Sequence, residues 1–183
     1  MPLKIDIPAS EFYDDEHDEF ISVREQTITL EHSLVSIAKW EAKWHIPFFN
    51  GTKSDKTNEQ IIDYVKFMTL TQNVDPNVYL VISTNSELVN QINAYIEDPM
   101  TATTFKKGTP PNPHQVITNE VIYWQMIALG IPIEFQKWHF NRLQTLIRVA
   151  QEKSNGKKMS KTDILRSNAE LNAARRKMLH SKG

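Results

Sequence analysis

The sequence predicts a mainly α-helical fold, namely a single compact helical domain with a small β-hairpin at its N-terminus. Strand-like alternation of apolar and polar residues is confined to residues 1–30, and beyond Leu30 apolar residues recur at helical spacing. The 183 residues are 40% hydrophobic and include only five glycines, which is typical of a globular chain with one domain. We expect a hairpin region at 1–30, a helical core at 31–155 and a loosely docked basic helix at 156–183.

The N-terminal hairpin is predicted from alternation. Leu3, Ile5 and Ile7 alternate with polar residues, as in a half-buried strand, and Pro8 ends this stretch. The acidic stretch YDDEHDE then favours a polar turn. The following FISVREQTITL is rich in β-branched residues and predicts one or two short strands that pair back on the first.

Two helices follow the hairpin. The spacing of apolar residues in LEHSLVSIAKWEAKW predicts the first, and HIPFFNG ends it. Thr57 and Gln60 have capping-box spacing and predict the start of the second. Its apolar stripe comprises Ile61, Ile62, Val65, Met68 and Leu70.

The middle of the chain is less regular. The run TQNVDPNVYLVIS suits a helix start at Asp75-Pro76 but is too short to assign. Thr84 and Glu87 form a second capping-box pair, and the helix after them ends before Pro99. Residues 100–117 contain three prolines and a glycine, which predicts a long loop.

The last part of the core is predicted as two helices. NEVIYWQMIALG follows Thr118 and is apolar nearly all round, so we expect it to be central and buried. Gly130 is expected just past its end, and Pro132 begins the longest periodic segment. Expected core positions in that segment are Ile133, Trp138, Leu146, Ile147 and Ala150.

Charge is unevenly distributed. Residues 1–50 hold ten acids and four bases, whereas residues 134–183 hold twelve bases and four acids. The two regions could pair within one fold or between subunits, or form two solvated faces. The last helix has few large apolar residues, so we expect it to dock loosely or to need a partner.

Several classes of protein are disfavoured by composition. The absence of cysteine removes disulfides, thiolate zinc sites and cysteine nucleophiles. The N-terminus lacks a signal-peptide pattern, and no apolar stretch approaches the roughly 20 residues needed to span a bilayer. We therefore expect a soluble, cytosol-made protein that does not contact a membrane.

Catalytic motifs are also missing. Lys158 to Lys161 spell KMSK, a signature of class I aminoacyl-tRNA synthetases, but no H-x-G-H motif accompanies them. Ser160 and Asp163 instead have the spacing of a helix cap with an acid in the first turn. Phosphate-binding loops, H-E-x-x-H and G-x-S-x-G are absent. We expect a protein that is not an enzyme and holds no cofactor or metal, with His32 and His139 serving packing or hydrogen bonding.

Partner-binding residues are predicted in two places. The tryptophans fall on helical stripes and mostly suit core packing, but Trp40 and Trp44 precede a loop and could present part of that face to a partner. In the C-terminal helix the predicted partner or self-association residues are Leu171, Arg175, Arg176, Met178 and Leu179. No aromatic residue interleaves with these bases, so nucleic acid is not the expected partner.

Five blocks together resemble a known family. In order they are LEHSLVSIAKWEAKWHIPF, MTLTQNVDPNVY, INAYIEDPMTATTF, IYWQMIALGIPIEFQKWHFNRLQTLIRV and KKMSKTDILRSNAELNAARRK. From about residue 25 to 180 the chain is similar to the tail assembly chaperones of long-tailed bacteriophages. These small proteins are encoded just before the tape measure protein.

The resemblance implies a non-enzymatic chaperone. Such a protein binds the elongated, largely helical tape measure protein, or other tail proteins, in the host cytoplasm while tail tube subunits polymerise. A homo-oligomer is a further expected assembly. Two alternatives remain open: a structural virion protein of the tail or neck and, more weakly, a phage protein that binds nucleic acid through the basic C-terminus.

Overall fold

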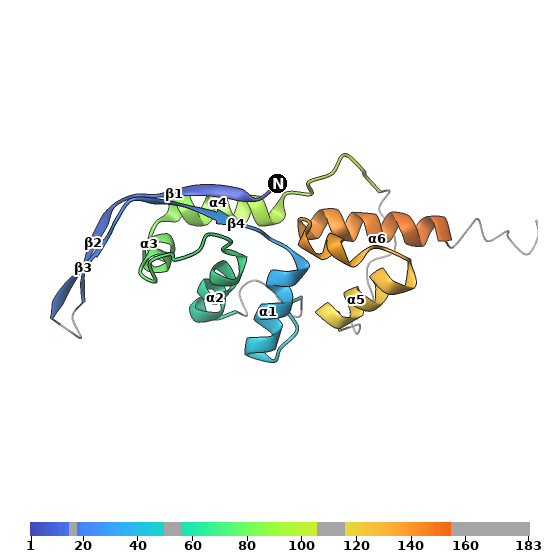
Figure 1. Ribbon diagram of the computed structural model, residues 1–183, viewed down its shortest axis with the longest axis horizontal. Coiled ribbons are helices and arrows are strands. Elements are labelled where there is room, and N and C mark those ends of the chain that lie inside the picture. The colour runs from blue at the N-terminus through green and yellow to red at the C-terminus, as the bar shows by residue number, and fades with distance from the viewer. Residues whose placement is uncertain (15–17, 50–55, 106–115, 155–183) are drawn as a thin grey trace, which may run out of the picture. The chain divides into compact units, whose positions relative to one another are not determined.

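The computed structural model describes residues 1–14, 18–49, 56–105 and 116–154. Its elements are β1 (Leu3–Ile7), β2 (Ser10–Asp14), β3 (Glu19–Val23), β4 (Gln26–Leu30), α1 (Leu34–Trp44), α2 (Asn58–Met68), α3 (Val78–Thr84), α4 (Ser86–Glu97), α5 (Asn119–Ala128), the 3-10 helix η2 (Ile133–Lys137) and α6 (Phe140–Ser154) (Figure 1). The mainly α-helical fold with N-terminal strands is confirmed.

The chain divides into two units, residues 1–148 and 149–183. The expected single domain is therefore not confirmed, and the boundaries at 30 and 155 stay predictions. Most of the second unit, including the expected C-terminal helix, lies outside the described residues. All packing described below belongs to the first unit.

The N-terminal strands form two antiparallel pairs. β1 pairs with β4, with Ile5 opposite Ile28, and β2 pairs with β3, with Tyr13 opposite Phe20. The prediction of β1 is confirmed, and FISVREQTITL, predicted as one or two strands, contributes to two. Only β4 pairs with β1 as expected, because β3 pairs with β2. The sequence missed β2, because we expected a polar turn to begin at Tyr13; in the strand Phe12 packs against the core and Glu11 is exposed.

Side-chain caps fix the starts of α1 and α2. The hydroxyl of Ser33 accepts from the backbone N–H of Ser36, and the Thr57 hydroxyl accepts from that of Gln60. The predicted capping box at Thr57 is thus confirmed. His45, at φ 55°, ends α1 in a left-handed conformation.

The predicted cap of α4 was wrong by one residue. The side-chain oxygen of Asn85 accepts from the backbone N–H groups of Glu87 and Leu88, at 3.0 and 3.3 Å. Thr84 instead ends α3, where its hydroxyl donates to the carbonyl oxygen of Leu80. Asn competes well for this position because its short side chain reaches the free N–H groups of the first turn.

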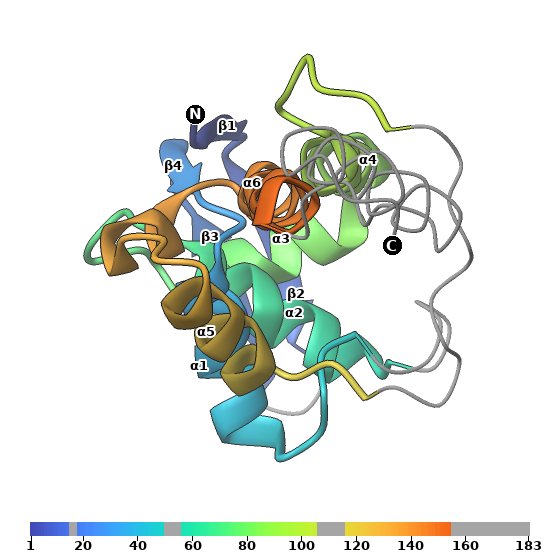
Figure 2. The same cartoon turned by 90° about the vertical axis from the view of Figure 1, so that its right-hand side faces the viewer.

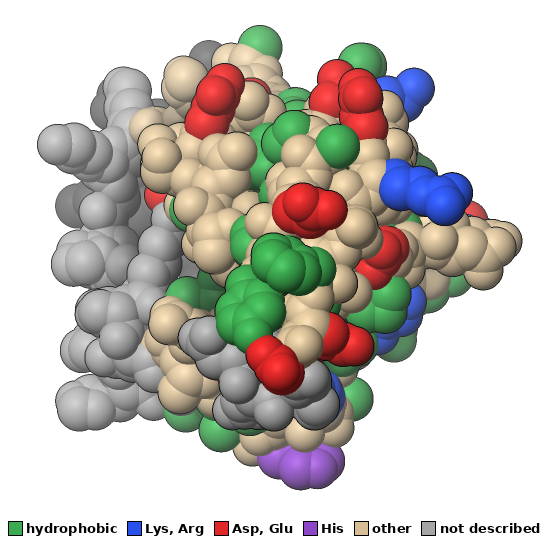
Figure 3. Space-filling model, turned by 90° about the vertical axis from the view of Figure 1, so that its left-hand side faces the viewer, with side chains coloured by type: hydrophobic (Ala, Val, Ile, Leu, Met, Phe, Trp, Pro, Cys, Tyr) green, Lys and Arg blue, Asp and Glu red, His purple; other side chains and the backbone are tan. Residues whose placement is uncertain are grey.

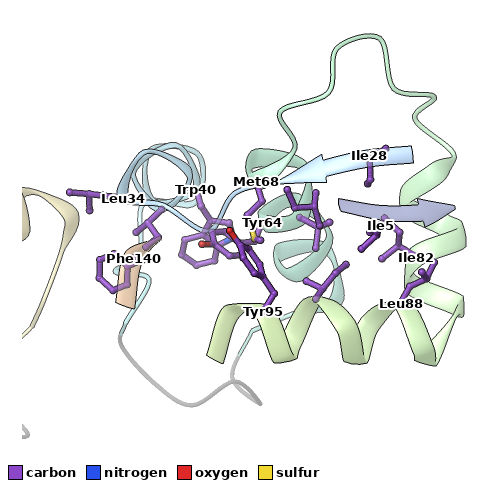
Figure 4. Close-up of a cluster of buried hydrophobic side chains, with 14 of the residues drawn as sticks. Ile5, Ile28, Leu34, Trp40, Tyr64, Met68, Ile82, Leu88, Tyr95 and Phe140 are labelled. Atoms are coloured by element: carbon purple, nitrogen blue, oxygen red, sulfur yellow. The ribbon is translucent and has the colours of Figure 1, made fainter. Parts of the chain in front are cut away.

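The core lies between the β1–β4 pair and the helices. Ile5 points toward Ile82 and Leu88 (Figure 4), in line with the packing of β1 against α3 and α4. The largest fully buried side chains are those of Trp40, Phe140, Ile5, Ile7, Ile28, Leu30, Leu34, Ile37, Met68, Met126, Leu143 and Val78. Of the stripe predicted on α2, Ile61 is half-exposed, and so is Leu70, which follows the helix.

The long helix predicted after Pro132 is broken into η2 and α6. The break at His139 allows a β-bridge to Ser33, and the backbone N–H of Phe140 donates to the carbonyl oxygen of His32 at 2.8 Å. Gly130 follows α5 at φ 66°, as predicted. Of the core positions predicted in this segment Ile147 is buried, but Ile133 is half-exposed.

Two buried histidines join the strands to the helices. Nδ1 of His32 lies 2.5 Å from the hydroxyl oxygen of Tyr64, and Nε2 of His139 donates to the carbonyl oxygen of Tyr95 at 2.9 Å. The two imidazole rings lie 5.1 Å apart in an edge-on arrangement. The prediction that both histidines serve packing and hydrogen bonding is confirmed.

Candidate partner-binding site

The junction of α1 and α5 is held by one carboxylate. The side chain of Glu41 accepts from the backbone N–H of Phe48 at 2.6 Å, from the backbone N–H of Asn119 at 2.8 Å and from the Asn119 amide. Thr118, the N-cap residue of α5, makes no side-chain cap. Glu41 therefore supplies the cap from another helix, and its negative charge suits the positive end of α5.

A hollow of about 480 Å³ lies along this junction. Figure 2 shows α5 beside α1 on this side of the unit. The floor contributed by α1 is made of small side chains, Ala38 and Ala42, and Ile46 and Pro47 continue it beyond the helix. Small side chains at this spacing leave room for another helix to approach closely.

The rim of the hollow is acidic. Glu120 is exposed, and its pKa is lowered by hydrogen bonds from the Thr118 hydroxyl, from its own backbone N–H and from the Asn119 amide. Its carboxylate therefore stays ionised at neutral pH. Glu120 lies in the first turn of α5, so a partner meets negative charge at the start of this helix.

The outer face of α5 is apolar and exposed. Trp124 and Ile127 are 67% and 74% exposed, and their spacing of three residues places them together on one face. Trp124 also lies one turn beyond Glu120, on the same side of the helix. The buried face of α5 is formed by Ile122 and Met126.

The prediction that this helix is central and buried was therefore wrong. An apolar pattern all round a helix does not show whether a second apolar layer comes from the same chain or from a partner. In the described residues α5 packs against α1 and η2, while Trp124 and Ile127 stay exposed. Apolar residues lie all round α5, and this pattern was the sequence signal that could have identified Trp124 and Ile127 as candidate partner-binding residues.

Of the partner-binding residues predicted from sequence, the structure describes Trp40 and Trp44. Trp40 is 0% exposed and its indole N–H donates to the carbonyl oxygen of Gln60 at 2.8 Å, so it belongs to the core and leaves the partner-binding set. Trp44 is half-buried beside Trp40 and stays a candidate. The predicted C-terminal residues Leu171, Arg175, Arg176, Met178 and Leu179 lie outside the described residues.

The two buried histidines have lowered pKa values. Burial lowers the pKa of His32 to about 3, with the nearby His139 adding to the effect, and burial also lowers the pKa of His139. Both rings are therefore neutral at pH 7. Within residues 1–14, 18–49, 56–105 and 116–154, no three side chains of His, Asp or Glu are grouped to hold a metal ion. None of the helices in these ranges is both long and apolar enough to cross a bilayer.

Comparisons with protein-family models, with curated proteins and with solved structures find no match to this chain.

Proposed function

We propose that this chain is a non-enzymatic tail assembly chaperone of a long-tailed bacteriophage, which binds the tape measure protein during tail morphogenesis. The resemblance of the five sequence blocks supports the family. The observation that carries the binding role is the exposed apolar face of α5, formed by Trp124 and Ile127 beside the α1–α5 hollow.

The chemistry of this surface favours one kind of partner. An amphipathic helix can lay an apolar stripe over Trp124 and Ile127, as in other complexes of a helix with a groove. Tryptophan is the residue type most enriched among energetically dominant interface positions. A Lys or Arg beside the stripe of the partner helix would lie near the ionised Glu120. Their attraction would orient the partner helix and raise the association rate. The tape measure implied by the resemblance is long and largely helical, so it offers many such segments.

Binding can be measured with a helical fragment of the tape measure protein encoded next to this chain. Co-expression and co-purification, followed by calorimetry, would give the dissociation constant. We expect Trp124→Ala to raise it about 30-fold or more, which corresponds to about 2 kcal/mol. Ile127→Ala should act in the same direction.

A matched control is available on another helix. Ile61 on α2 is half-exposed, so Ile61→Ala removes the same atoms as Ile127→Ala without touching the α5 face. Its affinity should equal that of the unchanged chain. Equal affinity for Trp124→Ala and the unchanged chain, or no binding of any tape measure fragment, would overturn the proposal.

The structural virion protein remains the alternative. The separation of acidic and basic residues along the chain favours it, because complementary faces are what repeated subunits need. Quantitative mass spectrometry of mature virions distinguishes the two functions. A chaperone should be expressed during infection and absent from the particle, whereas a component of the tail or neck should be present in fixed proportion to the major tail protein.

A further inference from the structure

The β2–β3 pair presents two aromatic rings to solvent. Tyr13 and Phe20 lie directly opposite each other on the two strands, with ring centroids 5.1 Å apart. They are 49% and 73% exposed. The Tyr13 hydroxyl donates to the carboxylate of Asp18, which holds the ring in place. Nothing in the described residues covers this pair of rings.

The opposite face of the same strand pair packs against the core. Phe12 and Ile21, also directly opposite each other, are partly buried and pack against the core. The strand pair is thus anchored from one side. Aromatic rings presented on a rigid, anchored element are a common feature of protein interfaces, because little conformational entropy is lost when they are covered.

The surroundings of the two rings are acidic. Residues 10–23 contain six Asp and Glu residues and no Lys or Arg. Of these acids, Glu11, on the same face as Tyr13, and Glu19, next to Phe20 along β3, are exposed. Figure 3 looks onto the end where β2 and β3 lie and shows hydrophobic side chains among acidic ones, with few basic ones. An occupant of this face must therefore combine apolar and basic side chains.

The C-terminal segment of the chain has this composition. Residues 157–183 contain eight Lys and Arg and two Asp and Glu, a net charge of +6, whereas residues 1–154 have a net charge of −7. Ile164, Leu171 and Met178 recur every seven residues, which places them on one stripe of a predicted helix. Arg175 lies one turn from both Leu171 and Met178.

We propose that the exposed face of the β2–β3 pair binds the basic segment 157–183 of a second copy of this chain. The strand pair and the C-terminal segment are two different parts of the chain, so this contact between two copies is heterologous and produces a ring or an open chain of subunits.

Sedimentation velocity on the full chain over a range of protein concentrations tests this proposal. The unchanged protein should associate at about 50 mM salt and dissociate at about 500 mM. The proposed contact is formed between exposed opposite charges, and salt screens their attraction. A first variant carries Glu11→Lys and Glu19→Lys, and a second carries Arg175→Glu and Arg176→Glu. In each variant alone the association constant should fall at least about tenfold.

Mixing the two variants is the decisive step. In the mixture the unchanged strand pair of the second variant meets the unchanged C-terminal segment of the first, and the basic strand pair of the first meets the acidic segment of the second. Hetero-association should therefore return, although each variant alone associates weakly. Tyr13→Ser with Phe20→Ser should weaken association at low salt, although it leaves the charges unchanged. The control, Glu59→Lys with Glu134→Lys, makes the same change in net charge at exposed positions outside β2 and β3 and should leave association intact.

Two results would overturn the proposal. One is that the unchanged protein stays monomeric at every concentration at low salt. The same result is expected if the C-terminal segment binds its own chain, so that outcome also contradicts the proposal. The other is a mixture of the two variants that fails to associate. Neither result bears on binding of the tape measure protein through α5, because Trp124 and Ile127 are unchanged in the variants with altered charge.

Discussion

Nδ1 of His32 lies 2.5 Å from the hydroxyl oxygen of Tyr64, inside the core. This contact connects the end of β4 to α2, and the ring of His32 also meets those of His139 and Phe140 edge-on. Because burial disfavours the charged imidazole, the pKa of His32 falls to about 3. The fold therefore depends on a histidine that stays neutral.

Acidification should destabilise the chain through His32. In the unfolded chain this residue takes up a proton near pH 6.5, whereas in the folded chain it does so only near pH 3. Between these values the unfolded state binds more protons, so stability is complete above about pH 6.5 and is lost as pH falls toward 3. Each pKa unit corresponds to about 1.4 kcal/mol.

The free energy of unfolding can be measured by urea unfolding at about pH 7.5, 6 and 5. These values begin above the unfolded-state pKa of His32 and fall toward its folded-state pKa. His32→Asn should lower stability at pH 7.5 and flatten its pH dependence. His45→Asn makes the same replacement at an exposed position and serves as the control. An equal slope in His32→Asn and the unchanged chain would show that other groups cause it.

Removing the Glu41 carboxylate should loosen α5. Glu41→Gln keeps one acceptor oxygen but replaces the other with an amide, so at least one of its three hydrogen bonds is lost. Leaving a buried donor without a partner costs about 1–3 kcal/mol. Urea unfolding should show this loss, and hydrogen exchange should be fastest in the first turn of α5.

Glu120→Gln is the control for Glu41→Gln. Glu120 is exposed, so the same replacement should cost well under about 1 kcal/mol, even though it removes a charge near the helix start. If both variants unfold at the same urea concentration, Glu41 does not fix α5 in the way the hydrogen bonds indicate.

Two tryptophans should differ sharply in their effect on stability. Trp40→Ala removes a fully buried ring and should cost about 3–5 kcal/mol, whereas Trp124→Ala removes an exposed ring and should change stability by about 0.5 kcal/mol or less. Thermal unfolding followed by circular dichroism measures both. A large loss for Trp124→Ala would mean that α5 is covered within the chain and would remove it as a partner surface.

The capping box of α2 gives a smaller test. The Thr57 hydroxyl accepts from the backbone N–H of Gln60, whose side chain accepts from the Thr57 N–H. Thr57→Ala should cost about 1 kcal/mol in urea unfolding. Thr118→Ala should cost less, because Thr118 makes no side-chain cap and Glu41 caps that helix. The reverse order would contradict this account of both helix starts.

The sequence alone determined what depends on neighbouring residues. β1, the end of α1, the capping box at Thr57 and the position of Gly130 were predicted correctly, because periodicity and cap chemistry act over a few residues. The neighbouring Thr84 and Asn85 show the precision of such reasoning. Both can cap a helix, and only the backbone conformation selected Asn85.

Tertiary structure decided what depends on residues far apart along the chain. Glu41 and Asn119, and likewise His32 and His139, meet only because the helices pack, and no local pattern links them. The same holds for α5, whose apolar residues point both inward and outward. An apolar pattern shows that a helix has surface to cover, but packing decides which face the chain covers itself and which, at Trp124 and Ile127, it leaves to solvent.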